Sequence, residues 1–346
     1  MTQFPGVDVH SNQTLNHALR GAGIIGLGMA VPERVLTNDD LAKFVETSDE
    51  WITSRTGIRQ RHVCDPETAT SDLAASAALA ALADAKLSPQ DLDLILCATA
   101  TGDYLWPSTA CVIQHKIGAT NAAAFDLSAA CSGFCYGLTV AGGLLRTGEM
   151  QNVLVIGADT LTKQLNWHDR GTCILFGDGA GAAVLTACNP DEGVIASYLG
   201  ADGSGVESIW MPGGGVRTPL TSENIGAGLN CIQMKGSEVY KFAVRIVPEV
   251  IERVLVRAKL QPEDIGLLVM HQANLRIIQA VAERFGIDDE RVFVNLHKYG
   301  NTSAASIPIA LTEAQAEGRL QRGKVIVTVG FGAGLTWGAN VLRWNK

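Results

Sequence analysis

This sequence has few charged and few aromatic residues. Only 18% of its 346 residues are Asp, Glu, Lys or Arg, and only 6% are Phe, Trp or Tyr. With 47% hydrophobic residues, a chain of this length buries about three quarters of its unfolded surface and is long enough for two domains or two halves. Its formal net charge of −8 argues against a broad surface for nucleic acid or for an anionic membrane.

Long apolar runs and paired cysteine motifs are also missing. No apolar stretch approaches the length of a membrane span, and the N-terminus lacks the basic and apolar regions of a secretory signal. None of the eight cysteines forms a CxxC pair, which favours reduced thiols in a cytoplasmic protein. Cys131 and Cys135 lie one helical turn apart but have no nearby histidine ligands, so we predict no metal site.

The second half of the chain resembles the first half. Lys86–Ala98 reads KLSPQDLDLILCA and Lys259–His271 reads KLQPEDIGLLVMH, an offset of 173 positions. All βαβ units share some pattern, but the close match at half the chain length favours duplication. Two such units are expected to pack as layered α/β structure with buried, mostly parallel strands. Two further pairs follow in the same order: Phe125–Cys131 with Val294–Gly300, and Val153–Gly157 with Val325–Gly330.

This duplication divides the chain into a polar N-terminal arm over residues 1–20, a first half over 21–190 and a second half over 191–346. Helices are predicted at 41–46, from Ser48 onward, at 70–86 with Ser71 or Asp72 as the cap, at 107–117, and at 236–259 with Pro248 as a candidate kink. Strands are predicted at 22–30, 92–99, 152–157, 182–186, 194–199 and 265–270, and residues 201–229 as a long surface excursion.

The stretch Phe125–Leu144 carries the strongest chemical signal. It reads as a strand, a tight turn and a helix, with Cys131 at the start of the helix. Unpaired backbone N–H groups and the helix dipole favour the thiolate form there, which is the nucleophilic form. On this stretch alone, however, a buried small residue is the safer interpretation of Cys131.

Two further polar residues follow predicted strands of the second half. His271 ends the strand at 265–270, and Asn301 lies in the small-residue segment Tyr299–Ser306. Taken singly, each has an ordinary interpretation, as a core histidine or as a turn residue. Because ligands in α/β sheets gather at the carboxyl ends of strands, we expect these two residues to meet Cys131.

Five motifs together make the sequence similar to the β-ketoacyl-acyl-carrier-protein synthases III of the thiolase superfamily. The resemblance runs in order from about residue 20 to the end of the chain. It implies a thiolase-like duplicated five-layered α-β-α-β-α fold, a homodimer, and the first condensation of type II fatty acid synthesis. The motifs are SDEWITSRTGIRQRH at 48–62, AACSGF at 129–134, HQANLRI at 271–277, GNTSAAS at 300–306 and GFGAGLTWG at 330–338.

The resemblance also implies the reaction and the roles of the residues. Cys131 would take a short acyl group, such as acetyl, from coenzyme A, which is a substrate and not a permanently bound cofactor. His271 and Asn301 would bind the thioester carbonyl of malonyl-acyl carrier protein and stabilise the enolate left by decarboxylation. That enolate would attack the acyl-Cys131 thioester, whose oxyanion the backbone N–H groups of Cys131 and Ala333 would hold. Many relatives have Gly at the position of Ala333.

Binding residues follow from the same resemblance. Trp51 and Arg170 would flank the adenine of coenzyme A, with Arg55 placed for its phosphates, although Arg55 and Arg59 could also be a solvated basic face. Phe176 would line the channel near Cys131, and Trp106 would cross the dimer interface and close the partner's acyl pocket. Trp106 could instead be an ordinary interface aromatic. Docking of the acidic acyl carrier protein is assigned to Lys241, Gln272, Arg276 and Arg284.

Three other functions remain open from the sequence. A relative that condenses other acyl groups in a secondary pathway would differ in its primers and acceptors. A non-catalytic partner subunit would lack the nucleophile, whereas Cys131, His271 and Asn301 are all present. A phosphate-binding protein built on Gly177–Gly181 is disfavoured, because that glycine run does not lie in the strand–GxGxxG–helix pattern.

Overall fold

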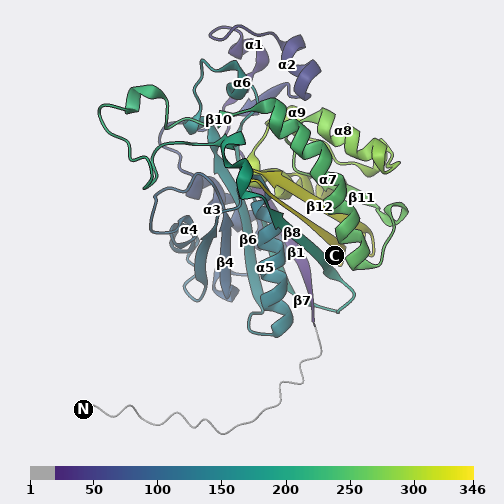
Figure 1. Cartoon of the computed structure of the whole chain (residues 1–346). Coiled ribbons are helices and arrows are strands. Elements are labelled where there is room, and N and C mark those ends of the chain that lie inside the picture. The colour runs from purple at the N-terminus through teal and green to yellow at the C-terminus, as the bar shows by residue number, and fades with distance from the viewer. Residues whose placement is uncertain (1–19) are drawn as a thin grey trace, which may run out of the picture.

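The computed structural model describes residues 20–346 (Figure 1), so the predicted N-terminal arm lies outside the described residues except for Arg20. The strands are β1 Gly21–Ala30, β2 Val35–Thr37, β3 Gln60–His62, β4 Leu94–Ala98, β5 Ala123–Leu127, β6 Asn152–Thr160, β7 Asp178–Cys188, β8 Gly193–Ala201, β9 Ile209–Trp210, β10 Gln233–Met234, β11 Leu267–Met270, β12 Val325–Gly332 and β13 Thr336–Arg343. The helices are α1 Asn38–Leu41, α2 Asp49–Thr56, α3 Thr70–Ala85, α4 Thr109–Ile117, α5 Gly133–Thr147, α6 Arg170–Cys173, α7 Gly236–Ala258, α8 Leu275–Arg284, α9 Leu296–Tyr299 and α10 Ser306–Ala316.

The main strands follow a mirrored order that reflects duplication. They run β11-β12-β13-β8-β1-β7-β6-β4-β5, so β8, β13, β12 and β11 of the second half mirror β1, β7, β6 and β4 of the first half, and β5 has no counterpart strand beyond β11. That junction consists of one parallel pair, Ala22 with Gly193. Seven of the nine strands run in one direction, as expected for mostly parallel strands, whereas β7 and β13 each run antiparallel to both of their neighbours.

Helices cover both outer faces and fill the space between the halves. On one outer face α3 and α4 pack against strands of the first half, and on the other α7 and α8 pack against strands of the second half. Between them, α5 and α10 share one core with the inward faces of both halves, for example Phe134 and Ile307 with Val155 and Ile326. This gives the five layers, while α1, α2 and α6 gather beyond one end of the sheets (Figure 1).

Backbone conformation repeats at the same offset of 173 positions. Lys86 and Lys259 both end their helices in the left-handed region, each with φ of 58°. Ala130 and Ser303 are the second such pair, with φ of 44° and 51°. The structural counterpart of Cys131 is therefore Ala304, and the pairing of Cys131 with Gly300 expected from the sequence is wrong. At this offset the short helix α9 stands where the first half has strand β5.

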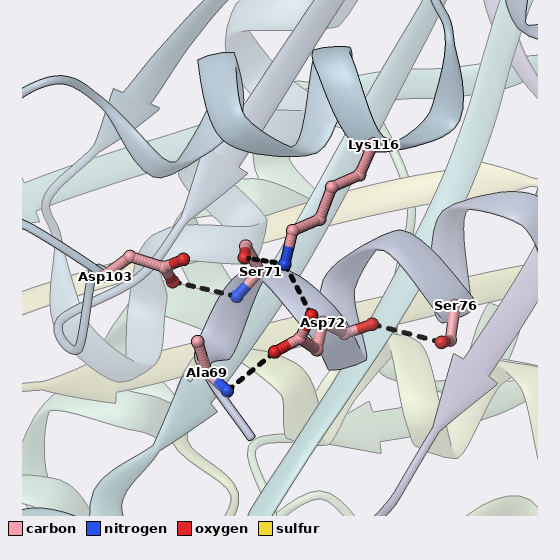
Figure 2. Close-up of polar contacts among 6 residues, drawn as sticks. All are labelled: Ala69, Ser71, Asp72, Ser76, Asp103 and Lys116. Carbon is pink, nitrogen blue, oxygen red and sulfur yellow. Dashed lines mark hydrogen bonds and ion pairs between the residues drawn. The ribbon is translucent and has the colours of Figure 1, made fainter. Parts of the chain in front are cut away.

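Several predicted element bounds also differ. The first predicted helix is only the single turn α1, which begins at Asn38, while α7 continues through Pro248. Asp72 in the first turn of α3 caps the helix. Its carboxylate accepts a hydrogen bond from the backbone N–H of Ala69, the residue before the helix, at 2.8 Å (Figure 2). Ser71 is not the cap, because its hydroxyl accepts from Lys116 on α4.

The basic cluster of residues 55–62 does not form one surface. Arg61 is completely buried, and burial lowers the pKa of its guanidinium to about 10. It donates hydrogen bonds to the Leu36 carbonyl, to Asn38 Oδ1 at 2.9 Å and to the Ile174 carbonyl at 2.7 Å. Through these hydrogen bonds Arg61 connects β2 and α1 with Ile174, which lies two residues before Phe176.

Candidate active site

Cys131, His271 and Asn301 line one cavity, although they come from three distant segments. Cys131 lies in the single turn 130–132 that precedes α5, His271 directly follows β11, and Asn301 follows α9. All three side chains are buried and border a narrow cavity of about 90 Å³. The sequence prediction that these residues converge agrees with this geometry.

The backbone around Cys131 is tightly packed. Ala130 adopts a positive φ, which costs on the order of 1–3 kcal/mol for a residue other than glycine. Gly332 at the end of β12 lies so close that a Cβ there would come within 2.9 Å of the Cys131 backbone nitrogen. A side chain at position 332 would therefore displace the turn, and Gly332 allows β12 to pass directly beside the thiol.

Burial dominates the ionisation of the Cys131 thiol. It raises the pKa of Cys131 to about 12, against the lowering effect of a hydrogen bond from Ser303. Burial therefore acts against the thiolate form that the helix start is expected to favour.

His271 is a neutral hydrogen-bond donor. Burial lowers the pKa of its imidazole to about 3. Its Nδ1 lies 2.7 Å from Ser306 Oγ, and that hydroxyl oxygen accepts a weaker hydrogen bond from the Gln272 N–H at 3.3 Å. Ser306 can then donate its own proton to Nδ1, which places the His271 proton on Nε2. The sequence gave no specific sign of this contact, although Ser306 belongs to the GNTSAAS motif.

Gln272 is a supporting residue of the core and not a docking residue. It is 1% exposed, so its assignment to carrier-protein docking is wrong. Its amide donates to the carbonyls of Met270 and Phe293 and accepts from the Asn295 N–H at 3.0 Å. These backbone groups offered the amide a full set of partners inside the protein, so no free energy is lost by burying it.

Asn301 is oriented by its own loop. Its Oδ1 accepts a hydrogen bond from the Ser303 N–H at 2.9 Å. Its backbone N–H donates to the Leu175 carbonyl, and its carbonyl accepts from Gly177, which fixes it beside Phe176. With the amide oxygen engaged, the Asn301 NH₂ group is the part left to donate into the cavity.

A second, wider cavity of about 220 Å³ meets the first at Cys131. Phe176 lines both, which agrees with its predicted place near the thiol, and Ala333 and Ser303 line the second. The second cavity is mostly apolar and fits a short alkyl chain. Residues of the stretch 201–229, which the sequence predicted to be a surface excursion, also line this second cavity, and the sequence did not indicate that. The remaining apolar lining residues are Ala100, Ala130, Leu161, Ile209, Trp210, Met211 and Ile232.

Trp51, Arg55 and Arg170 form a cluster near the narrow cavity. The guanidinium groups of Arg55 and Arg170 lie 4.3 Å and 4.7 Å from the centre of the Trp51 ring. Asn274, which lines the cavity, donates a hydrogen bond to the Arg55 carbonyl at 3.1 Å. The cluster therefore stands beside the wall of the cavity that leads to Cys131.

The other predicted cations differ in their surroundings. Lys241 is exposed in the first turns of α7, and Arg276 is exposed at the start of α8, where its Nε donates to the Ser54 carbonyl. Arg284 lies at the far end of α8 and pairs with Glu252 at 3.1 Å. The hydrogen bond of Arg276 reaches α2, the helix that carries Trp51 and Arg55.

The loop that carries Trp106 is fixed at its base and exposed at its tip. Figure 2 shows Asp103 accepting a hydrogen bond from the Ser71 N–H at the start of α3, at 2.9 Å. At the tip, Tyr104, Leu105 and Trp106 are 63%, 89% and 85% exposed. Trp106 lines neither cavity of its own chain.

Within residues 20–346, no cluster of three or more His, Cys, Asp or Glu side chains could hold a metal ion. All eight cysteines are free thiols. Across the same residues, no helix combines the length and the apolar character that crossing a membrane requires.

Sequence comparisons show the family of the chain. The family described as "3-Oxoacyl-[acyl-carrier-protein (ACP)] synthase III" matches residues 125–203, and its C-terminal family matches residues 255–344. The beta-ketoacyl-[acyl-carrier-protein] synthase III of Caldanaerobacter subterraneus subsp. tengcongensis is 54% identical over 325 residues, covering 94% of this chain and 98% of the relative. The corresponding protein of Desulfitobacterium hafniense is 53% identical, with the same coverage.

A solved structure matches equally well. The crystal structure of 3-oxoacyl-[acyl-carrier-protein] synthase III from Aquifex aeolicus superimposes with a TM-score of 0.87 at 48% identity, covering 94% of this chain and all of that chain. Mixed α/β thiolase-like folds with a buried nucleophilic cysteine at a turn before a helix define a class of acyl-transferring enzymes. This chain belongs to the β-ketoacyl-acyl-carrier-protein synthase III family, the acyltransferases that carry out the initiating condensation of type II fatty acid synthesis.

Proposed function

We propose that this chain condenses a short acyl-CoA, acetyl-CoA first of all, with malonyl-acyl carrier protein through an acyl-Cys131 intermediate, as a homodimer in the cytoplasm. The observation that carries the proposal is the meeting of Cys131, His271 and Asn301 at one cavity. A second, apolar cavity beside the same thiol offers room for the acyl chain.

The residues divide between two half-reactions. In the first, Cys131 sulfur bonds to the acyl carbon and coenzyme A leaves as its thiol, while backbone N–H groups of Cys131 and Ala333 hold the oxyanion. In the second, loss of CO₂ from the malonyl group leaves an enolate whose oxygen accepts hydrogen bonds from His271 Nε2–H and the Asn301 NH₂ group. Two neutral donors favour charge that develops in the transition state. The enolate carbon then bonds to the acyl carbon and the Cys131 sulfur leaves.

Coenzyme A would approach through the Trp51 cluster. An adenine stacked between Trp51 and Arg170 needs about 7 Å between the two planes, at about 3.5 Å for each stacking contact. Because the Arg170 guanidinium already lies 4.7 Å from the ring centre, it must move off the ring when the nucleotide binds. The exposed Lys241 and Arg276 are the best placed cations for the acidic carrier protein, while Arg284 is partly neutralised by Glu252.

The dimer is supported by an uncovered edge and loop of the first half. Strand β5 is the last strand of its sheet, and its Phe125 is 43% exposed. The neighbouring tip, Tyr104–Trp106, is also exposed and apolar. Exposed strand edges and apolar patches of this kind are usually covered by a partner. A second copy of the chain would cover both and bring Trp106 to the partner's wide cavity.

A condensation assay tests the proposal. Purified protein is mixed with malonyl-acyl carrier protein and each of a series of primers from acetyl-CoA to decanoyl-CoA, and the 3-oxoacyl product is measured. We expect the highest kcat/KM with acetyl-CoA or another short primer. The proposal would be contradicted if decanoyl-CoA were the only primer that gave product, or if product formed only with an acceptor other than malonyl-acyl carrier protein.

Removing the Trp106 side chain should lengthen the accepted primer. If Trp106 closes the partner's pocket, Trp106→Ala should raise kcat/KM for octanoyl-CoA relative to acetyl-CoA, by about 10-fold or more, since each methylene is worth about 1–3 kcal/mol. Leu105→Ala on the same exposed tip is the matched control and should leave the profile unchanged. An unchanged profile in Trp106→Ala would mean that Trp106 is only an interface aromatic.

The neutral state of His271 predicts a flat pH profile for decarboxylation. Because burial lowers its pKa from 6.5 to about 3, His271 keeps its Nε2 donor at every pH above about 5. Malonyl decarboxylation should therefore show no inflection near pH 6.5 that depends on His271. An inflection near pH 6.5 that disappears in His271→Ala would overturn this assignment.

The same pKa shift makes the stability of the fold depend on pH. Unfolding exposes the imidazole to protonation, so His271 lowers the free energy of unfolding as the pH falls from 6.5 towards 3.

A further inference from the structure

Helix α10 supports His271 and also carries a carboxylate on the same face. His271 Nδ1 lies 2.7 Å from Ser306 Oγ, and Ser306 is the first residue of α10. Glu313 follows seven positions later, which is about two turns of an α-helix, so the two side chains leave the helix on one side. The face of α10 that supports one donor to the enolate oxygen therefore also presents Glu313.

Glu313 is a mostly buried carboxylate with three donors. Its side chain is 17% exposed. Its Oε2 accepts a hydrogen bond from Asn295 Nδ2 at 2.8 Å, and its Oε1 accepts from Lys298 Nζ at 3.1 Å and from the Tyr299 hydroxyl at 2.8 Å. Burying a carboxylate costs free energy unless donors of this kind satisfy it, so the three contacts favour a single arrangement of this segment.

All three donors belong to the short segment that leads to Asn301. Asn295 precedes α9 and the other two donors are the last two residues of α9, so Glu313 holds this single turn at both ends. Only Gly300, with a φ of 66°, separates α9 from Asn301. A displacement of α9 would therefore reach Asn301 across one residue.

The same segment also contacts the residue beside His271. The Asn295 N–H donates to Gln272 Oε1 at 3.0 Å, and the Gln272 N–H donates to the Ser306 hydroxyl at 3.3 Å. Hydrogen bonds thus run from Ser306 through Gln272 and Asn295 to Glu313. This network connects the support of His271 with the segment that carries Asn301.

We propose that Glu313 is a positioning residue that holds Asn301 at the place where its NH₂ group and His271 meet the enolate oxygen. Glu313 lines neither cavity, so it acts through α9 and not on the substrate. A donor stabilises developing charge only when it lies within hydrogen-bond distance of the charged oxygen, so loss of the anchor is felt in decarboxylation. The inference rests on the proposed decarboxylation at His271 and Asn301.

Glu313→Ala should slow the release of CO₂ from malonyl-acyl carrier protein by about 10- to 100-fold, because a misplacement of about 1 Å costs up to about 100-fold. The fall should be in kcat with KM unchanged, because the donor acts mainly in the transition state. Burst release of coenzyme A reports acetylation of Cys131 and should keep its wild-type rate, since Cys131 is held by other contacts.

Double variants show whether Glu313 acts through Asn301. Added to Asn301→Ala, Glu313→Ala should slow decarboxylation no further, because the group that it positions is already absent. Added to His271→Ala, it should still slow decarboxylation by its full factor. Tyr299→Phe removes only one of the three donors to Glu313, so it should cause a smaller fall in the same half-reaction.

The alanine variant is expected to fold, because α9 has other attachments. Leu296 is completely buried, and the His297 carbonyl accepts a hydrogen bond from the Arg59 N–H at 3.2 Å. Glu313→Gln keeps the shape of the side chain and one acceptor oxygen, so it should lose less activity than the alanine variant. It carries the same test if Glu313→Ala does not fold.

Asp84→Ala is the matched control for a general loss of stability. The Asp84 side chain is 29% exposed, and it accepts hydrogen bonds from the Leu27 N–H at 2.8 Å and from the Gln315 amide of α10 at 3.0 Å. Asp84 lines neither cavity and its donors lie outside segment 295–301. This variant should lose stability and keep the wild-type rates of both half-reactions.

Three kinetic results would overturn the positioning role. They are an unchanged decarboxylation rate in Glu313→Ala, an equal fall of both half-reactions, and a further fall when Glu313→Ala is added to Asn301→Ala. If the wild-type protein releases no CO₂ from malonyl-acyl carrier protein, the proposed function fails instead. Crystal structures of the wild type and of Glu313→Ala then decide separately, because the inference requires Asn301 to move while Cys131 and His271 stay in place, and an unmoved Asn301 refutes it.

Discussion

Cys131→Ala is expected to form no acyl-enzyme with acetyl-CoA and no condensation product. The sulfur supplies the bond that holds the acyl group between the two half-reactions, and no other group at the junction of the cavities can replace it. Loss of a nucleophile of this kind costs about 10⁴- to 10⁶-fold in turnover. Intact-mass and peptide mass spectrometry after incubation with acetyl-CoA measure the adduct, and the condensation assay measures turnover.

Cys135→Ala provides the matched control. Cys135 lies one turn further along α5, is equally buried, and its pKa is also raised to about 12 by burial. It lines neither cavity, and its sulfur faces Thr328 on β12 instead. We expect this variant to keep the acetyl adduct on Cys131. An adduct on Cys135 or on the exposed Cys111 in the wild-type protein, with Cys131 unmodified, would overturn the assignment.

The site residues that could be predicted are those with local signals. Cys131 and His271 each follow an apolar stretch, Asn301 stands in a small-residue segment, and all three belong to short motifs. The layers were predictable for the same reason. Strand direction was not, because a strand buried on both faces is a continuous apolar run whether its neighbours are parallel or antiparallel. The sequence therefore did not indicate the antiparallel pairing of β7 and β13.

The residues that escaped prediction act through contacts between segments distant in sequence. Gln272 was assigned to carrier-protein docking, yet three backbone groups satisfy its amide inside the protein. Ser306 is an ordinary residue in its own segment, and its partner lies 35 positions away. Ile209 and Met211 reach the wide cavity from a stretch whose glycines and prolines indicated only a loop.

His271→Ala and Asn301→Ala are each expected to permit acylation of Cys131 but to slow malonyl decarboxylation by about 100-fold or more. Each substitution removes one of two donors to the enolate oxygen, and loss of one such donor costs about 10²- to 10³-fold. Acylation should continue because Cys131 and the wide cavity that it lines remain in place. Burst release of coenzyme A measures the first half-reaction, and release of CO₂ from malonyl-acyl carrier protein measures the second.

The two variants should differ in stability, which separates a local effect from a general one. Asn301→Ala also removes the acceptor of the Ser303 N–H, so it should lower the free energy of unfolding by about 1–3 kcal/mol. His271→Ala instead leaves a cavity beside Phe331, whose ring packs 5.4 Å from the imidazole, and frees the Ser306 hydroxyl. His297→Ala, at a histidine that lines neither cavity, is the control and should decarboxylate normally. If His271→Ala and Asn301→Ala both decarboxylated at the wild-type rate and failed only in acylation, their donors would serve the first oxyanion, and the division of labour between the two half-reactions would be reversed.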